Sequence, residues 1–207
     1  MPEKLPRVPV HLKTGHKPFH AGGCAIGPKL KLLCDYWRWS NSDLLSNTQR
    51  GVLAEYLVAT ALGLDDKPRD EWAAWDMKMC SGKTIEVKSS AYIQSWSQCC
   101  FTEIDFDIAP RKWGFDADTG ETTIANPPRR FADVYVFCLL KHKDQGTVDP
   151  LNVDQWEFYV LSADCLNKEC CDQRQIGLRR LCKLAGGALP YADLRGAVES
   201  AAGSAYR

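Results

Sequence analysis

The sequence predicts an α/β fold, on the border with α+β, in which a central mixed β-sheet is flanked by helices. Three observations predict it: a capped apolar helical segment near the start, several strand-like segments after it, and helical patterns at the end of the chain. Elements in this order are typical of a sheet that buries its faces against helices.

The first helix is expected over about residues 47–63. Ser46 and Gln49 match the capping box that begins a helix, and Gly63 is a natural stop. The apolar side chains of residues 51–63 go nearly all the way round, so we expect a helix buried in the centre of the domain. Glu55 is the only charge within these residues.

Strands follow this helix. Residues 75–79 and 83–90 are expected to form a hairpin around Ser81 and Gly82, and residues 99–108 a third strand. Residues 111–130 indicate a long polar loop or a small hairpin insertion. The nearly continuous apolar run 132–141 predicts a central strand covered on both faces, and 156–162 another strand. Helices are expected around 163–170, 176–184 and 191–202.

The N-terminal segment differs in composition from the rest. Residues 1–38 are rich in Pro, Gly and Lys and carry seven Lys and Arg residues against two acidic ones. We expect a basic N-terminal arm over 1–38 and a single domain over 39–207. Because the whole chain has no net charge, any contact with nucleic acid must come from local patches.

Cysteine usage and hydropathy bear on the compartment. The N-terminus has no apolar core of signal-peptide length and no membrane span is evident, so we expect a cytoplasmic protein whose ten cysteines are reduced thiols. No cysteine group has standard zinc spacing. Two looser zinc candidates stay open: Cys165, Cys170, Cys171 and Cys182, and His11, His16, His20 and Cys24.

One charged constellation lies on the predicted hairpin. The tripeptide Glu-Val-Lys occurs at chance level by itself, but alternation along a strand puts Glu86 and Lys88 on one face and Ile85 and Val87 on the other. A hairpin centred near residue 81 places Asp76 opposite Glu86, about 5 Å away. Two such carboxylates repel unless a proton or cation intervenes, and Mg²⁺ takes oxygen ligands of this kind.

Glu55 is an independent third acid, because a lone carboxylate in an apolar helix is costly to bury without a partner. A metal ion bound at the edge of the sheet would compensate the charge of the Glu55 carboxylate. Ordinary alternatives exist for each residue. Glu86 and Lys88 can form an exposed charge pair, Asp76 can belong to the turn, and Glu55 can pair with Arg50 or Arg38.

These residues resemble the PD-(D/E)XK nuclease superfamily, which has a restriction-endonuclease-like core. The resemblance covers about residues 47–98, although Trp75 stands where the family pattern has proline. It implies that Asp76, Glu86 and Glu55 bind Mg²⁺, with Mn²⁺ expected to substitute, and that all four residues including Lys88 are catalytic. In this scheme Lys88 positions the attacking water and offsets negative charge.

Further residues were assigned to nucleic-acid contacts. Ser89 and Gln94 follow the lysine closely, and two arginines follow a stiff Asn-Pro-Pro segment; surface hydrogen bonding and an ordinary solvated loop are the simpler explanations. Two tryptophans are candidates for stacking on bases. The expected contacts are Ser89, Gln94, Arg129 and Arg130, with Trp96 and Trp113 as stacking candidates.

The sequence therefore predicts a Mg²⁺-dependent endonuclease acting on DNA in restriction, phage defence or DNA repair. A homodimer is expected because two sites must address two strands, and no organic cofactor or membrane is expected. The alternatives are a non-catalytic nucleic-acid-binding module that keeps the fold, and an interaction subunit whose carboxylates lie in direct salt bridges.

Overall fold

The computed structural model describes residues 10–25 and 31–203. The chain divides into two compact units, Met1–Ser42 with Asp65–Pro68, and Asp43–Leu64 with Arg69–Arg207. The predicted boundary between an arm and a nuclease-like domain stays a prediction. Within the described residues, no helix is both long and apolar enough to cross a lipid bilayer.

The first unit contains a short hairpin and a helix that the sequence did not predict. Strand β1 (His20–Ala21) pairs antiparallel with β2 (Cys24–Ala25), and helix α1 spans Leu33–Asn41. The carboxylate of Asp35 accepts a hydrogen bond from the backbone N–H of Leu32 at 2.9 Å and so caps α1. Helix α1 thus begins within the segment 1–38, for which the sequence predicted only a basic arm and no helix.

The second unit is built on a mixed four-stranded sheet, as predicted. Its order is β3-β4-β8-β9, in which β4 and β8 run parallel and the outer pairs run antiparallel. All residues of β8 are buried, which explains its continuous apolar sequence. The strands are β3 (Met77–Lys78), β4 (Thr84–Ala91), β8 (Val134–Leu140) and β9 (Trp156–Ser162).

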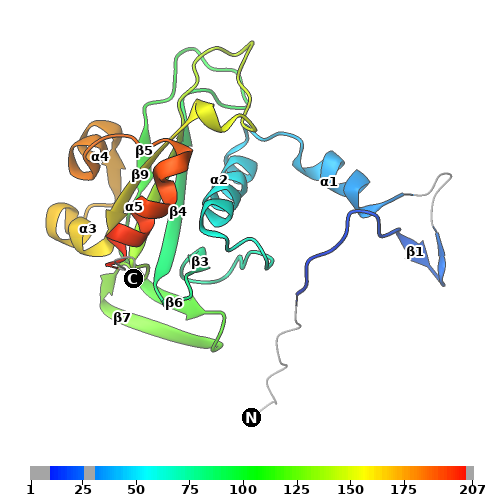
Figure 1. Ribbon diagram of the computed structural model, residues 1–207, viewed down its shortest axis with the longest axis horizontal. Coiled ribbons are helices and arrows are strands. Elements are labelled where there is room, and N and C mark those ends of the chain that lie inside the picture. Colours follow the sequence, from blue (N-terminus) through cyan, green and yellow to red (C-terminus); the bar gives the residue numbers. More distant parts are fainter. Residues whose placement is uncertain (1–9, 26–30, 204–207) are drawn as a thin grey trace. The chain divides into compact units, whose positions relative to one another are not determined.

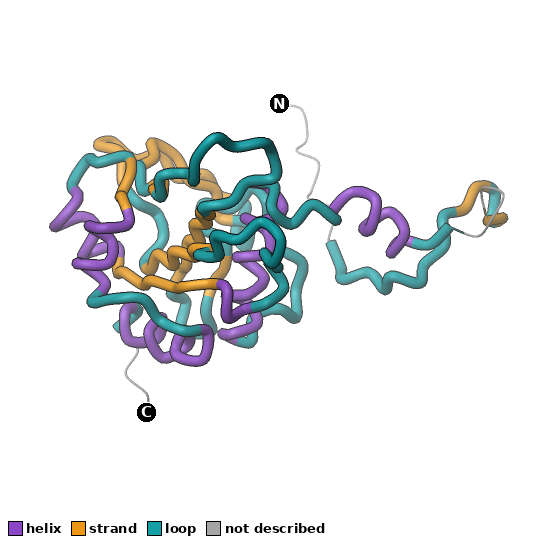
Figure 2. The backbone as a smooth tube through the Cα atoms, turned by 90° about the horizontal axis from the view of Figure 1, so that it is seen from above, coloured by secondary structure: helices purple, strands orange, loops and turns teal. Residues whose placement is uncertain are grey.

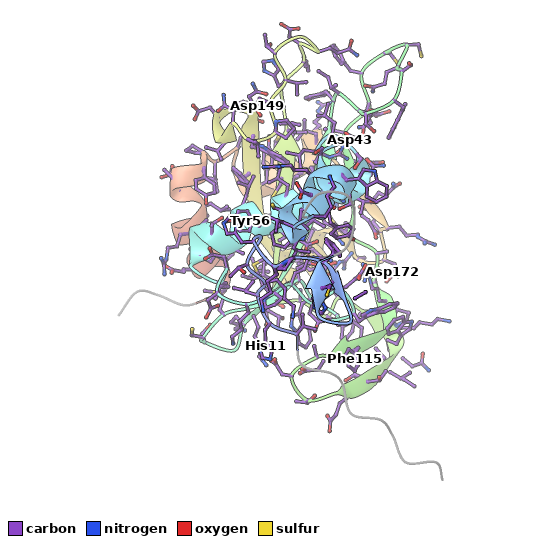
Figure 3. All side chains as sticks on the ribbon, turned by 90° about the vertical axis from the view of Figure 1, so that its right-hand side faces the viewer. His11, Asp43, Tyr56, Phe115, Asp149 and Asp172 are labelled. Carbon is purple, nitrogen blue, oxygen red and sulfur yellow. The ribbon has the colours of Figure 1, made fainter. Side chains whose placement is uncertain are left out.

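Helix α2 (Asn47–Leu62) begins and ends where the sequence predicts. The Ser46 hydroxyl accepts from the backbone N–H of Gln49 at 3.3 Å, and Gly63 adopts the left-handed conformation with φ 70°. The prediction that α2 is buried on all sides is wrong: Tyr56 is 55% exposed, and Figure 3 labels it on this helix. Only one face of α2 packs on the sheet.

Helices cover both faces of the sheet (Figures 1 and 2). Helices α2 and α5 (Leu194–Ala201) share one apolar core with the sheet, whereas α3 (Ala163–Cys170) and α4 (Leu178–Ala185) share the other. All four helices coincide with segments predicted to be helical, although α4 extends one residue beyond its segment. Short 3₁₀ turns precede β9 and α5, at Val153–Gln155 and Tyr191–Asp193.

Two small antiparallel ladders complete this unit. The predicted third strand is only β5 (Asp105–Asp107), and it pairs with β10 (Gln175–Gly177) instead of the main sheet. The segment expected to be a polar loop or hairpin is a hairpin of β6 (Arg111–Asp116) and β7 (Glu121–Arg129), drawn at the lower edge of Figure 1.

Candidate active site on the β3–β4 hairpin

The β3–β4 hairpin has the register that the sequence predicts. Met77 pairs with Ile85 and Lys78 with Thr84, so continuing the ladder by one residue places Asp76 opposite Glu86. Gly82 makes the turn possible, because its φ of 84° is a conformation that other residues rarely adopt. The hairpin thereby brings two carboxylates to the same edge of the sheet.

Strand β4 separates apolar and charged side chains, also as predicted. Ile85 and Val87 belong to the core beneath α2, whereas Glu86 and Lys88 alternate with them and point to the other face. On that face Glu86 pairs in register with Tyr135 of β8. Burial, and then the charge of Glu86, raise the pKa of the Tyr135 hydroxyl.

Asp76 is the electrostatic centre of the site. Burial raises the pKa of its carboxyl to about 7, and the negative charges of Glu86 and Glu55 add to the shift. Lys88 and a hydrogen bond from the Val87 N–H to Oδ2, at 2.6 Å, act in the opposite direction. The four residues predicted to be catalytic therefore interact with one another.

Glu86 is held by two cations. Its Oε1 lies 2.5 Å from Nζ of Lys88 and 3.5 Å from Nη2 of Arg111, which comes from β6. The Glu86 side chain is only 9% exposed and that of Lys88 19%. Glu86 and Lys88 therefore form a charge pair, but the pair is largely buried and is not the exposed surface pair of the simpler explanation.

Glu55 has a different partner from those the sequence suggested. Arg69 donates to both carboxylate oxygens, from Nε to Oε2 at 2.8 Å and from Nη2 to Oε1 at 3.2 Å. This bidentate pair raises the pKa of Arg69. The prediction that Glu55 pairs with Arg50 is wrong. The Arg50 guanidinium donates instead to Leu45 O, Gln94 Oε1 and Asn47 Oδ1.

The oxygens left free define what the site can bind. In the part of the chain that the structure describes, no group of three or more His, Cys, Asp or Glu is arranged to hold a metal ion. Among those same residues, however, no donor reaches Oδ1 of Asp76 or Oε2 of Glu86. Two carboxylate oxygens and several waters are a common ligand set for Mg²⁺, so the donor chemistry fits that ion.

Ser89 and Gln94 do not join this cluster. Ser89 is partly buried and alternates with Lys88, so it lies on the opposite face of β4. Gln94 is buried: its amide accepts from Arg50 at 3.0 Å and donates to Ala91 O at 2.8 Å. These contacts give Gln94 a structural role and correct the expectation that it faces a phosphate.

The two consecutive arginines have opposite environments. Arg129 is exposed at the end of β7 with its guanidinium 4.7 Å from the centre of the Phe131 ring. Arg130 is buried, and its guanidinium donates to Ile108 O, Asn167 Oδ1, Cys171 O and Gln173 O. The expectation that Arg130 reaches a phosphate is therefore corrected, because each of its three guanidinium nitrogens already donates to a protein oxygen.

Arg69 and Arg111 are site residues that the sequence reasoning missed. Arg69 lies 14 positions after Glu55 and Arg111 lies 25 after Glu86, so no local spacing signals either contact. A weaker signal existed in the charges themselves, since each partly buried carboxylate requires a cation or hydrogen-bond donor nearby. That requirement predicts a partner without identifying it.

Comparison with models of known protein families gives a match. A family model described as bacteriophage T4 endonuclease IV matches residues 34–174, well over half of the chain. The matched region includes all four strands of the main sheet, helix α2 and the β6–β7 hairpin. A search of curated proteins finds no match.

Proposed function

Since the chain belongs to the bacteriophage T4 endonuclease IV family, we propose that it is a Mg²⁺-dependent DNA endonuclease of the PD-(D/E)XK type. The catalytic cluster is Asp76, Glu86, Lys88 and Glu55. One observation carries this assignment: the Asp76 carboxyl is surrounded by the negative charges of Glu86 and Glu55, and its pKa is raised to about 7. Such a cluster favours a bound cation.

Asp76 and Glu86 would hold the ion through the oxygens that accept no hydrogen bond, and Glu55 would act on it through a water. When bound, Mg²⁺ supplies Lewis-acid stabilisation of the phosphate and lowers the pKa of a coordinated water. Lys88, beside Glu86, orients the attacking water and offsets negative charge that develops on the scissile phosphate. Arg111 adds a second positive charge beside the same carboxylate.

The biological setting is restriction, phage defence or DNA repair in the cytoplasm. We expect a homodimer, because cleavage of both strands of a duplex requires two sites. Mn²⁺ is expected to replace Mg²⁺, since both ions accept carboxylate and water oxygens. Arg129 is exposed at the end of β7, so its guanidinium can reach a DNA phosphate as the sequence predicts.

One observation favours a second candidate, a non-catalytic nucleic-acid-binding module. Both glutamates form direct salt bridges. Glu86 pairs with Lys88 and Arg111, and Glu55 pairs with Arg69. In such a module these pairs would be permanent structural contacts. The two candidates predict different effects of substituting Lys88. In a binding module the substitution would lower the stability of the fold, whereas in an enzyme it would lower the rate of DNA cleavage.

The test is cleavage of plasmid and linear DNA in Mg²⁺, Mn²⁺ or EDTA. We expect Lys88→Ala to lower the cleavage rate by about 100-fold or more, the typical cost of removing one group that stabilises developing charge. Asp76→Asn should lose metal-dependent cleavage as well. Lys141→Ala is the matched control, because Lys141 also pairs with a glutamate of the sheet, at 3.5 Å from Glu157. Equal rates for the native protein and Lys88→Ala would contradict the proposed site.

A further inference from the structure

The β6–β7 hairpin exposes an apolar pair that nothing in the described chain covers. Trp113 of β6 and Ile124 of β7 are directly paired in the ladder, so both side chains point to the same face. Trp113 is 59% exposed and Ile124 is 81% exposed. Single exposed apolar residues are ordinary, but two adjacent large ones on a ribbon mark an interaction surface.

Packing of the opposite face fixes the direction of this pair. Gly114, next to Trp113, is buried, and a Cβ at that position would lie 2.7 Å from the Phe131 ring and 2.8 Å from Ala74. The backbone of the hairpin therefore rests closely on these two side chains. Because neighbouring residues of a strand point to opposite faces, Trp113 is directed away from the body of the protein.

The same hairpin contacts the candidate active site. Arg111, at its base, donates to Glu86 at 3.5 Å, and Phe115 O accepts from the backbone N–H of Ala74 at 2.8 Å. Figure 3 labels Phe115 on this ribbon. Arg111 and Trp113 are two residues apart across a register shift in the ladder, so they lie at most about 7 Å apart along the chain, which equals about two base steps of DNA. The pair at Trp113 would thus lie within a few nucleotides of a phosphate bound at the metal site proposed for Asp76 and Glu86.

Charge on the hairpin is divided between its two ends. The end near Glu86 is basic and the turn is acidic. A polyanion such as DNA is therefore attracted to the basic end, which lies next to the Trp113–Ile124 pair. The basic residues are Arg111, Lys112 and Arg129, and the acidic ones are Asp116, Glu121 and Asp118, of which Asp118 pairs with Lys78 at 3.0 Å. A two-stranded ribbon also has dimensions that a DNA major groove admits.

We propose that the Trp113–Ile124 face binds the bases of substrate DNA beside the scissile phosphate, Trp113 by stacking and Ile124 by apolar contact. The proposal rests on the proposed endonuclease function. It assigns the hairpin two tasks: Arg111 contacts the catalytic carboxylate, and the apolar pair orients the DNA next to it. Aromatic stacking tolerates any base, and apolar side chains are used as wedges at base steps.

The test combines DNA binding with a fluorescent base. DNA carrying 2-aminopurine at successive positions around the mapped cleavage point is mixed with the protein, with Ca²⁺ in place of Mg²⁺, and its fluorescence and anisotropy are measured. Trp113→Ala and Ile124→Ser are compared with the native protein. Leu151→Ala is the matched control, because Leu151 is also a large exposed apolar side chain, 68% exposed, and lies in the loop before β9.

We expect the native protein to change 2-aminopurine fluorescence at one or two positions beside the cleavage point. Trp113→Ala should abolish that change and weaken binding by about 5- to 100-fold, and Trp113→Phe should restore both. Both substituted residues are exposed, so thermal unfolding should be unchanged. Unchanged binding by the double variant Trp113→Ala/Ile124→Ser, or an equal loss in Leu151→Ala, would overturn the proposal.

Other outcomes separate this proposal from the proposed function. If the native protein cleaves DNA and the hairpin variants bind it normally, only the hairpin proposal fails. If Lys88→Ala cleaves normally while Trp113→Ala loses binding, only the catalytic assignment fails. A native protein that binds no DNA overturns both. If the double variant dissociates a dimer without affecting DNA binding, the apolar pair is an interface between copies of the chain and the proposal is wrong.

Discussion

Asp76→Asn is expected to stabilise the protein while it removes activity. Asparagine has nearly the same shape as aspartate, and its side-chain oxygen can still accept the hydrogen bond that Val87 N–H donates at 2.6 Å. What the substitution removes is a negative charge that burial and the neighbouring Glu86 and Glu55 disfavour. The folded protein without metal should therefore gain stability when this charge is absent.

The magnitude and the sign follow from the raised pKa. The folded state holds the Asp76 proton up to about pH 7, whereas the ordinary value is 3.8. The contribution of this group to stability is therefore fully present below about pH 4 and is lost as the pH rises through about 7. A shift of this size corresponds to about 4 kcal/mol. Because Asp76 is only partly buried, we expect about 2–3 kcal/mol between the variant and the native protein at pH 8.

The assay is urea unfolding in EDTA at pH 4 and pH 8. Asp76→Asn should be more stable than the native protein at pH 8, and the difference should nearly vanish at pH 4. Asp133→Asn is a control with the opposite sign. Although burial opposes it, hydrogen bonds from Thr84 and Lys83 lower the pKa of Asp133, so its loss should destabilise at pH 8. An Asp76→Asn variant that is less stable than the native protein at pH 8 would refute the reasoning.

Three further substitutions test roles that the structure assigns. Arg130→Met should lower the free energy of unfolding by about 3 kcal/mol in urea titrations, because it removes the donor of four hydrogen bonds, one buried and three partly buried. Gly114→Ala should cost about 1–3 kcal/mol in the same assay, since its Cβ would lie 2.7 Å from the Phe131 ring. Arg129→Gln should leave stability unchanged but reduce the salt dependence of DNA binding by about one phosphate contact.

Local signals in the sequence were sufficient for much of the fold. Ser46 and Gly63 mark the ends of α2 because capping is decided within one turn of the helix. The hairpin register followed from the position of the turn near Gly82, which placed Asp76 opposite Glu86 before any tertiary contact was considered. Strand β8 was evident because a strand buried on both faces must be apolar throughout.

The errors arose where the decisive contact was distant in the sequence. Two consecutive prolines before Arg129 suggested a loop, but β7 pairs only with β6 and proline is tolerated on such an edge strand. Arg130 and Gln94 were placed on the surface because polar side chains usually are. Their hydrogen-bond partners lie up to 44 residues away in the chain, and no pattern within a helix or strand encodes such pairs.

The carboxylates of the site differ in how their charge is balanced, and this difference indicates the residue on which the proposed function depends most. Glu55 is neutralised by Arg69, and Glu86 by Lys88 and Arg111. Asp76 forms no ion pair among the described residues, and its proton is the one held to about pH 7. A fold selected for stability alone favours an apolar or amide side chain at this position, because an unpaired buried charge is costly. A cation-binding site requires an unpaired carboxylate of this kind, held opposite Glu86 by the hairpin. A purely structural network of ion pairs does not explain why Asp76 has no cationic partner in the described part of the chain.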